Sequence, residues 1–417
     1  MKRINFQIQD KPYRWLIFAC AVALLVGCGG EKKKKKNECQ GNKTYIMIND
    51  TLRTRLTEFS LKPRVRGQFA FQVYDLTADK LVYGCNEKLA LPSASCLKLL
   101  TGVAGLHLLG THHTYTTSIY TRGNLSNGVL QGDVTFKGSL DPQLLESDFS
   151  MFTKALRRKG INKIGGKVFI DLVIQDPVKS EEHWYPWDLS FSRYGIFYKG
   201  APRILNGFKV ALRQQGLAVA DSQVVLGPLP KGSVCIYRFA RSLDPVLQRM
   251  WKNSSNTQST GLLYTIGHRV NPYAYPPAAG VEYLRKFLRE DIGLLDTTLV
   301  IHDGCGLCTY NRLSPEALTR ILTYGYQHQE IFQHLWKHLS ISGVDGTLKH
   351  EVSSPKIQGR VHGKTGTLSH PFGISSLAGY CTAKDGHLLA FAMMQSEMSV
   401  LDARVLQRKF CEVLVQP

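Results

Sequence analysis

The sequence predicts a mixed α/β protein: a sandwich of an antiparallel sheet with helices, interrupted by one smaller inserted α/β domain. Three observations predict this fold class. Strand-length runs rich in aromatic and β-branched residues lie near both ends of the chain, a long apolar helix follows the first of them, and short strands alternate with Gly-rich turns and helices in the middle. The 417 residues, 43% hydrophobic and 20% charged, can form two domains or one domain with a large insertion.

The N-terminus is predicted to be a lipoprotein signal peptide. Basic residues precede the apolar stretch "WLIFACAVALLV", which is short for a membrane span. This stretch runs into Leu25-Val26-Gly27-Cys28, which is similar to a lipobox, where Cys28 would be acylated and become the new N-terminus. An uncleaved membrane anchor is the alternative. In both cases we expect the body of the protein to be exported to the cell envelope and held at a membrane, facing the periplasm.

The segment after the signal peptide contains the run "EKKKKK" and is interpreted as a solvated tether, because like charges repel one another and oppose packing. The formal net charge of +20 suits a cell-wall or membrane setting. Each basic residue near an anionic lipid surface contributes about 1 kcal/mol, so the run would assist an acyl anchor. Nucleic acid is excluded as a partner, because a secreted chain rarely meets it and the sequence contains no recognition motif for it.

The cysteines suit an oxidising compartment. Of the ten, Cys20 would leave with the signal peptide and Cys28 would be acylated, which leaves eight that could form disulfides in any pairing. Cys305 and Cys308 form a Cys-x-x-Cys pair, but we found no second pair or histidine set at zinc spacing. The sequence therefore predicts no metal site and no cofactor.

The first strands and the helix after them bring a serine and a lysine together. "GQFAFQVYDL" and "KLVYGCN" are predicted to be paired strands, and apolar residues recur at helical spacing through "SCLKLLTGVAGLHLLG". Ser95 then lies in the first turn of the helix, and Lys98, three positions on, shares its face. Burial of Lys98 in this apolar helix would lower its pKa towards that of a usable base.

Other residues near this pattern are weaker candidates. A second Ser-x-x-Lys, Ser353 to Lys356, contains a proline in a turn-rich stretch that cannot form a helix. Ser93 lies before the helix and is interpreted as structural. Cys96 follows Ser95 by one helical step and so points about 100° away, into the packed side.

The rest of the chain supplies the inserted domain and the end of the sandwich. Helical periodicity resumes in "LDPVLQRMWKNSSNTQSTGLLYTIG", with "NSSN" between two helices. Three strand-length runs follow near the end, with a "KDG" hairpin signal between the last two, before a closing amphipathic helix. We expect these segments, in order: signal peptide 1–28, lysine-rich tether 29–44, first part of the main domain 45–118, inserted domain 119–232, and second part of the main domain 233–417.

Three short motifs stand in order along the chain: Ser95-x-x-Lys98, Ser254-x-Asn256 and Lys364-Thr365-Gly366. Together they match the set found in β-lactamases and penicillin-binding proteins. With "LQGDVTFKGSLDP", "HDGCGLCTYNRLSP", "SGVDGTL" and "GKTGTL…LAGY", the chain from about residue 45 to its end resembles the D-alanyl-D-alanine carboxypeptidase/endopeptidase family, the class C low-molecular-mass penicillin-binding proteins. The resemblance implies a serine β-lactamase/transpeptidase-like sandwich, split by the inserted domain.

The residues also fit the chemistry of a serine D,D-peptidase. Ser95 would attack the carbonyl between two D-alanines, and Lys98 would accept its proton if burial and the like charge of Lys364 keep it neutral. Ser254 could relay the proton to the leaving amine. Asn256 could hold the substrate amide and Lys98 in place.

The third motif is expected to bind the substrate. Lys364, Thr365 and Thr367 would hold its terminal carboxylate, in the Lys-Thr-Gly strand that contains Gly366. The resemblance further implies an oxyanion hole made by the backbone N–H groups of Ser95 and Thr367.

The resemblance names peptidoglycan stem peptides and β-lactam antibiotics as ligands, with the membrane reached through the lipid anchor. A β-lactamase and a catalytically silent peptidoglycan-binding lipoprotein are the alternatives, which the lifetime of a bound antibiotic would separate. The balance of carboxypeptidase and endopeptidase action, the diamino acid of the stem and the oligomeric state stay open.

Two stretches depart from the family pattern. Cys305 and Cys308 stand where the family has serines, and we interpret them as packing residues, with a disulfide or redox role as the alternative. After Asn256 the chain has "TQST" where the family usually continues with alanine and an acidic residue, a difference that could alter the hold on the substrate.

Overall fold

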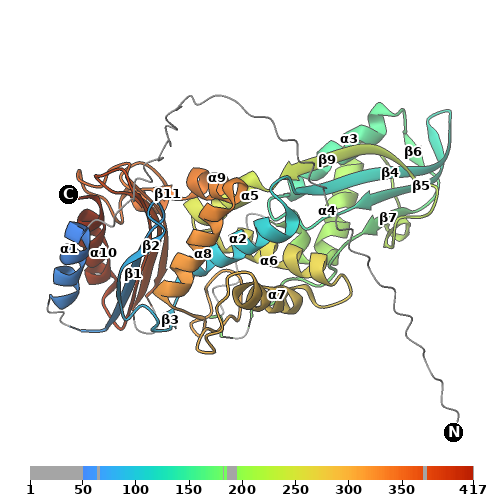
Figure 1. The fold of residues 1–417 in the computed structure, drawn as a ribbon. Coiled ribbons are helices and arrows are strands. Elements are labelled where there is room, and N and C mark those ends of the chain that lie inside the picture. Colours follow the sequence, from blue (N-terminus) through green and yellow to red (C-terminus); the bar gives the residue numbers. More distant parts are fainter. Residues whose placement is uncertain (1–49, 63–65, 182, 186–194, 370–372, 417) are drawn as a thin grey trace, which may run out of the picture. The chain divides into compact units, whose positions relative to one another are not determined.

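The computed structural model describes residues 50–62, 66–181, 183–185, 195–369 and 373–416 (Figure 1). They lie in one compact unit, Ile46–Pro417. The predicted signal peptide, Cys28 and the lysine-rich tether lie outside the described residues. Within the described ranges, no helix combines the length and the apolar character needed to span a bilayer.

A six-stranded antiparallel sheet forms one layer of the main domain, in the order β11-β12-β13-β14-β1-β2. Its strands come from the two ends of the described chain: β1 (Gln68–Asp75), β2 (Lys80–Cys85), β11 (Ser340–Ile341), β12 (Val361–Leu368), β13 (Ile374–Thr382) and β14 (Leu388–Ser396). β1 and β14 pair over their whole length, from Gln68 opposite Ser396 to Asp75 opposite Leu389. The β1–β14 pair therefore joins segments that are far apart in the sequence.

This sheet is buried on both faces. Successive side chains of a strand point to opposite sides, so neighbouring residues of one strand enter different hydrophobic cores. In β14, Ala390, Ala392 and Met394 face one hydrophobic core. The residues between them, such as Phe391 and Met393, face the other. The sequence of β14, LLAFAMMQS, is therefore an almost continuous apolar run.

Helices cover each face of the sheet (Figure 1). On one face lie α1 (Asp50–Leu61) and α10 (Val400–Val415). On the other lies a helical layer built around α2, whose members are α2 (Leu97–Leu109), α5 (Asp244–Lys252), α6 (Asn256–Val270), α7 (Pro276–Glu290), α8 (Pro315–Gln327) and α9 (Gln329–His338). α2 contacts all the other helices of this layer, so its N-terminal turn lies where several elements converge.

A second sheet occupies the middle of the chain, in the order β8-β7-β5-β4-β9, with β6 paired to β5. Its strands are β4 (Thr114–Ser126), β5 (Val129–Lys137), β6 (Lys163–Ile164), β7 (Val168–Asp171), β8 (Val224–Leu226) and β9 (Val234–Ser242). The pairs of β4 are antiparallel and the remaining pairs are parallel. α3 (Phe149–Arg158) and α4 (Ala201–Gln214) pack on this sheet through an aromatic cluster around Phe136.

The predicted fold class is confirmed: a helix-covered antiparallel sheet is accompanied by a second, mixed sheet. The hairpin at "KDG", the break between α5 and α6 at "NSSN" and the closing helix are also where the sequence predicts them. The boundaries of the inserted domain stay a prediction. One detail differs, because Ser95 lies in a short 3₁₀ turn (Ala94–Cys96) just before α2 rather than in the α-helix itself.

The ring of Phe410 anchors α10 to the sheet, and its loss should destabilise the protein. Its centroid lies 5.7 Å from Phe59, 5.0 Å from Phe71 and 5.9 Å from Phe391. Truncation of a fully buried phenylalanine leaves a cavity, so we expect Phe410→Ala to lower the free energy of unfolding by about 3–5 kcal/mol in urea titrations. Val405→Ala, at an exposed position of the same helix, is the control and should change it by less than about 0.5 kcal/mol. Equal effects of the two substitutions would contradict this account of the core.

Candidate active site

The turn that carries Ser95 connects β3 (Leu91–Pro92) to α2. Between Leu91 and Leu106, Ser95 is the one residue that is not buried. Ala94 before it has a φ of 43°, in the left-handed region that non-glycine residues rarely adopt. The strained backbone at Ala94 thus positions the hydroxyl of Ser95 at the edge of an otherwise buried segment.

Two other backbone segments press against this turn, and glycines allow their approach. A Cβ on Gly306 would lie 1.8 Å from the carbonyl oxygen of Ala94, and one on Gly366 would lie 2.9 Å from the backbone nitrogen of Ser95. Gly366 is in β12, the strand of the Lys-Thr-Gly motif. The close approach explains why that motif contains a glycine and brings its strand to the nucleophile candidate.

Lys98 lies in the first turn of α2 and is fully buried. Its Nζ lies 2.8 Å from Ser95 Oγ, 2.8 Å from Asn256 Oδ1 and 2.5 Å from the carbonyl oxygen of Cys305. Burial lowers the pKa of Lys98, as the sequence predicts. One buried amine therefore joins the first motif, the second motif and the loop of Cys305.

The second motif is held in the break between α5 and α6. Ser254 has a φ of 57°, so the chain turns sharply there, and Ser255 caps α6 by accepting from the backbone N–H of Gln258. Asn256, the first residue of α6, then aims its side-chain oxygen at Lys98. The strained turn and the capped helix set the directions of the two motif side chains.

Lys364 is the second fully buried amine. It donates to Ser254 Oγ at 2.8 Å and to the carbonyl oxygen of Thr365 at 2.5 Å. Burial, followed by the nearby charge of Lys98, lowers the pKa of Lys364 to about 7. Two amines share one buried site, and their mutual repulsion adds to the cost of keeping both charged.

The other residues of the third motif lie on the same strand in different surroundings. Thr365 is buried, and its hydroxyl donates to Thr347 Oγ1 at 2.8 Å. Thr367 is half-buried, and Arg404 of α10 donates to its hydroxyl at 3.3 Å. The structure therefore forms two neighbouring hydrogen-bonded groups, one of Ser95, Lys98 and Asn256 and one of Ser254 and Lys364. Gly366 lies against the turn of Ser95, and the hydroxyl of Thr365 has a separate contact.

Asp303 is a site residue that the sequence reasoning missed. Its buried carboxylate accepts from the backbone N–H groups of Cys305 at 3.0 Å, Gly306 at 2.6 Å and Cys308 at 2.7 Å. These contacts fold the loop so that the carbonyl of Cys305 reaches Lys98. The available signal was the Asp-Gly pair in "HDGCGLC", because aspartates before glycines commonly accept from the next backbone N–H groups in a turn.

The two cysteines of this loop are buried and free. Burial raises the pKa of both thiols, to about 11 for Cys308. Cys96 is also buried, and its thiol donates to the carbonyl oxygen of Lys364 at 3.0 Å. A buried thiol with a raised pKa is a poor nucleophile, so the described geometry favours packing roles for these cysteines.

Comparisons with known proteins agree with this geometry. The sequence model of the D-Ala-D-Ala carboxypeptidase 3 (S13) family matches residues 52–194 and 197–415. The chain is 22% identical over 422 residues to the D-alanyl-D-alanine carboxypeptidase DacB of Haemophilus influenzae, covering 80% of this chain and 86% of that protein. It is 28% identical over 207 residues to a D-alanyl-D-alanine carboxypeptidase of Actinomadura sp., covering 47% of this chain and 37% of that protein.

Solved structures share the fold. Penicillin-binding protein 4 of Haemophilus influenzae superposes with a TM-score of 0.72 at 18% identity, covering 88% of this chain and 100% of that one. A predatory peptidoglycan endopeptidase of Bdellovibrio bacteriovorus gives a TM-score of 0.58 at 14% identity, covering 84% of this chain and 93% of that one. With the family model matching most of its length, the chain belongs to the D-Ala-D-Ala carboxypeptidase 3 (S13) family of serine-type carboxypeptidases.

Proposed function

We propose that Ser95 is the nucleophile with which this D-Ala-D-Ala carboxypeptidase cleaves peptidoglycan stem peptides and with which it is acylated by penicillins. The observation that carries the proposal is the 2.8 Å contact between the buried amine of Lys98 and Ser95 Oγ. Ser95 is also the one half-buried residue of an otherwise buried segment, so we expect a substrate to reach its hydroxyl.

Lys98 is proposed to be the general base. A neutral amine has two N–H donors and one lone pair. The carbonyl oxygens of Asn256 and Cys305 can accept the two N–H groups, which leaves the lone pair directed at Ser95 Oγ. The hydroxyl proton then passes to Lys98 as Oγ attacks the carbonyl between the two D-alanines.

The proton must next reach the leaving group. As the tetrahedral intermediate collapses, the C–N bond breaks and the terminal D-alanine leaves as an amine, which takes up one proton. We propose that the proton held by Lys98 reaches the leaving nitrogen through Ser254. The Ser254 oxygen accepts from Lys364, so its own O–H can donate to the leaving nitrogen while the oxygen regains a proton from Lys98. Water then hydrolyses the ester of Ser95 and restores the free enzyme. In an endopeptidase reaction the leaving amine belongs to the side chain of a second stem peptide.

Lys364 is proposed to bind the terminal carboxylate. A protonated amine has three N–H donors, and two of them go to Ser254 and the carbonyl of Thr365. Among the described residues the third has no acceptor, so it is available for the substrate. Thr367 lies farther along the strand with a half-buried hydroxyl near Arg404 and can add a second donor. The backbone N–H groups of Ser95 and Thr367 are proposed to hold the developing oxyanion.

Two relatives support these ligands. Penicillin-binding protein 4 of Haemophilus influenzae has been solved in complex with a β-lactam. The related enzyme of Bdellovibrio bacteriovorus is described as a peptidoglycan endopeptidase. We propose that this chain likewise binds β-lactams and acts on both the free ends and the cross-links of stem peptides.

We further propose that the protein is a lipoprotein with the order of segments expected from its sequence. Cys28 is its acylated N-terminus, the lysine-rich tether follows it, and residues 119–232 are the inserted domain. A two-signal anchor of one acyl group and a basic run suits an enzyme whose substrate lies close to the membrane.

The first test asks which side chain forms the penicillin ester. Opening of the β-lactam ring breaks its C–N bond and adds the whole antibiotic to Oγ, so intact-protein mass spectrometry should show one adduct. We expect Ser95→Ala to abolish the adduct. Cys96→Ala removes the neighbouring buried thiol and is the matched control, so it should keep the adduct. Peptide mapping that places the antibiotic on Cys96 or Ser93 would overturn the mechanism.

The second test uses the pH dependence of the reaction. The pKa of Lys364 is lowered to about 7, so its positive charge is present below that pH and lost above it. We expect kcat/KM for a peptide ending in D-Ala-D-Ala to fall as the pH rises through about 7, because this ratio reports the free enzyme. The same peptide with an amidated C-terminus has no carboxylate to bind and should lack this fall. Identical profiles for the two peptides would rule out the assigned role of Lys364.

The third test concerns the anchor. Cys28→Ser removes the thiol that would carry the acyl group, and we expect it to move the protein from the membrane fraction to the soluble fraction after cell lysis. Cys20→Ser, within the apolar segment, is the control and should leave the protein in the membrane fraction. A Cys28→Ser variant that remains membrane-bound with its N-terminal segment intact would show that the segment itself is the anchor.

A further inference from the structure

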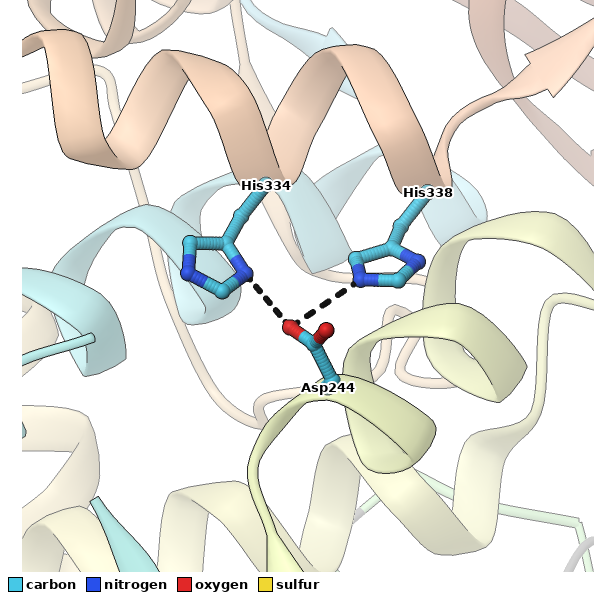
Figure 2. A group of neighbouring side chains, drawn as sticks. All are labelled: Asp244, His334 and His338. Carbon is cyan, nitrogen blue, oxygen red and sulfur yellow. Dashed lines mark ion pairs between the residues drawn. The ribbon is translucent and has the colours of Figure 1, made fainter. Parts of the chain in front are cut away.

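Three metal-ligating side chains meet where α9 packs against α5, in a cluster that the peptidase mechanism does not use. His334 and His338 lie four positions apart on one face of α9, and Asp244 lies in the first turn of α5. Figure 2 shows both rings turned towards the carboxylate of Asp244. His334 Nδ1 lies 2.7 Å and His338 Nε2 lies 3.2 Å from the same oxygen, Asp244 Oδ1.

These contacts are short, yet they are not hydrogen bonds. Asp244 Oδ1, His334 Nδ1 and His338 Nε2 are all buried, and none of the three has a contact with hydrogen-bond geometry among the described residues. The other carboxylate oxygen, Oδ2, accepts from Lys337 at 2.6 Å. Three unpaired polar atoms in one cluster are unusual, since nearly all buried polar groups have a partner.

A second histidine–aspartate pair of the same protein shows what an ordinary ion pair looks like. His387 Nδ1 lies 2.6 Å from Asp75 Oδ2 in hydrogen-bonding geometry, and the other oxygen of Asp75 accepts two backbone N–H groups. That hydrogen bond raises the pKa of His387. The cluster on α9 differs in geometry, because Asp244 Oδ1 and the two ring nitrogens form close ion-pair contacts without hydrogen-bond geometry.

We propose that Asp244, His334 and His338 bind one zinc ion. Two imidazole nitrogens and one carboxylate oxygen are a donor set that zinc takes in proteins, with water in the fourth position. The donor atoms all lie within 4.8 Å of one another, and a tetrahedral ion with bonds of about 2.0–2.1 Å requires ligand atoms about 3.3 Å apart. The 3.2 Å contact already fits, and the 2.7 Å contact needs a small movement of His334, the less buried ring.

The chemistry of the donors selects the class of ion. Calcium and magnesium prefer sites made of oxygen atoms, whereas imidazole suits zinc and other transition metals. The side chain of His338 is 5% exposed, so few water molecules could compete with an ion for its Nε2. Lys337 holds the second carboxylate oxygen and so orients Asp244, although its charge opposes that of the ion.

An ion at this point would act on the supports of the active site. It would tie the first turn of α5 to the last turn of α9. α5 leads to Ser254, and α9 leads into β11, the strand that pairs with β12. The far end of α5 is already tied to the segment after α9, since Ser340 Oγ donates to the carbonyl of Lys252 at 3.0 Å. Zinc would tie the other end of α5 to α9.

The sequence alone did not predict this site. A His-x-x-x-His pair places two ligands on one helical face, but without a third ligand nearby it has no particular meaning. Asp244 is far from the pair in sequence, and only the packing of the two helices joins them. The expectation of no metal site rested on the surroundings of Cys305 and Cys308.

The test is zinc titration of the full chain in detergent, after removal of metals with a chelator. We expect one equivalent of zinc by calorimetry and a rise of the Tm on its addition. His338→Ala and His334→Gln should each weaken binding by more than about 100-fold, the upper range for loss of a supporting contact. His350→Ala, at an exposed position outside the cluster, should bind as the wild type does.

Two further measurements keep the test decisive if a variant folds poorly. Lys337→Gln removes the competing charge, so we expect it to bind zinc several-fold more tightly. Cobalt(II) in place of zinc should give the intense visible absorption of a tetrahedral site in the wild type and lose it in His334→Gln. Zinc affinity that is equal in all variants, or no binding at micromolar zinc, would overturn the proposal and leave an ion-pair cluster.

Discussion

The active site depends on the burial of one amine. Lys98 lies in an apolar helix with no access to water, so each of its polar contacts must come from the protein. Those contacts come from Ser95, from Asn256 and from the carbonyl of Cys305, in three segments far apart in sequence. A change in any of the three segments leaves the amine with an unmade bond, and this ties the geometry of the nucleophile to the fold of the whole domain.

The second buried amine, Lys364, adds repulsion between like charges to this arrangement. Lys364 is as deeply buried as Lys98, and burial followed by the nearby charge of Lys98 lowers the pKa of Lys364. This repulsion suits the proposed roles, in which Lys98 is a neutral base and Lys364 binds a carboxylate. Backbone strain at Ala94 and Ser254 is a second local cost, because both residues adopt left-handed conformations at the candidate site. The stable sheet and the helical layer offset these local costs.

The sequence predicted those features that rest on local spacing. Ser95 and Lys98 are one helical turn apart, and the apolar periodicity around them is sufficient to predict burial of the lysine. The sequence did not predict features that depend on contacts between distant segments. The role of Asp303 comes from three backbone N–H groups that only the folded loop presents. Likewise, nothing local shows that the hydroxyl of Thr365 faces Thr347, because a strand pattern does not say which neighbours cover each face.

The pairing of β1 with β14 has a consequence for how the protein is made. The strand that precedes the nucleophile turn finds its partner only after almost the whole chain has been synthesised, because Gln68 pairs with Ser396. Contacts of such sequence separation form slowly and late. The strand of Lys364, β12 (Val361–Leu368), is also synthesised late, so Ser95 and Lys98 lack the surroundings that this strand and β14 supply until the chain is almost complete. The topology therefore postpones assembly of the candidate site until synthesis is nearly finished.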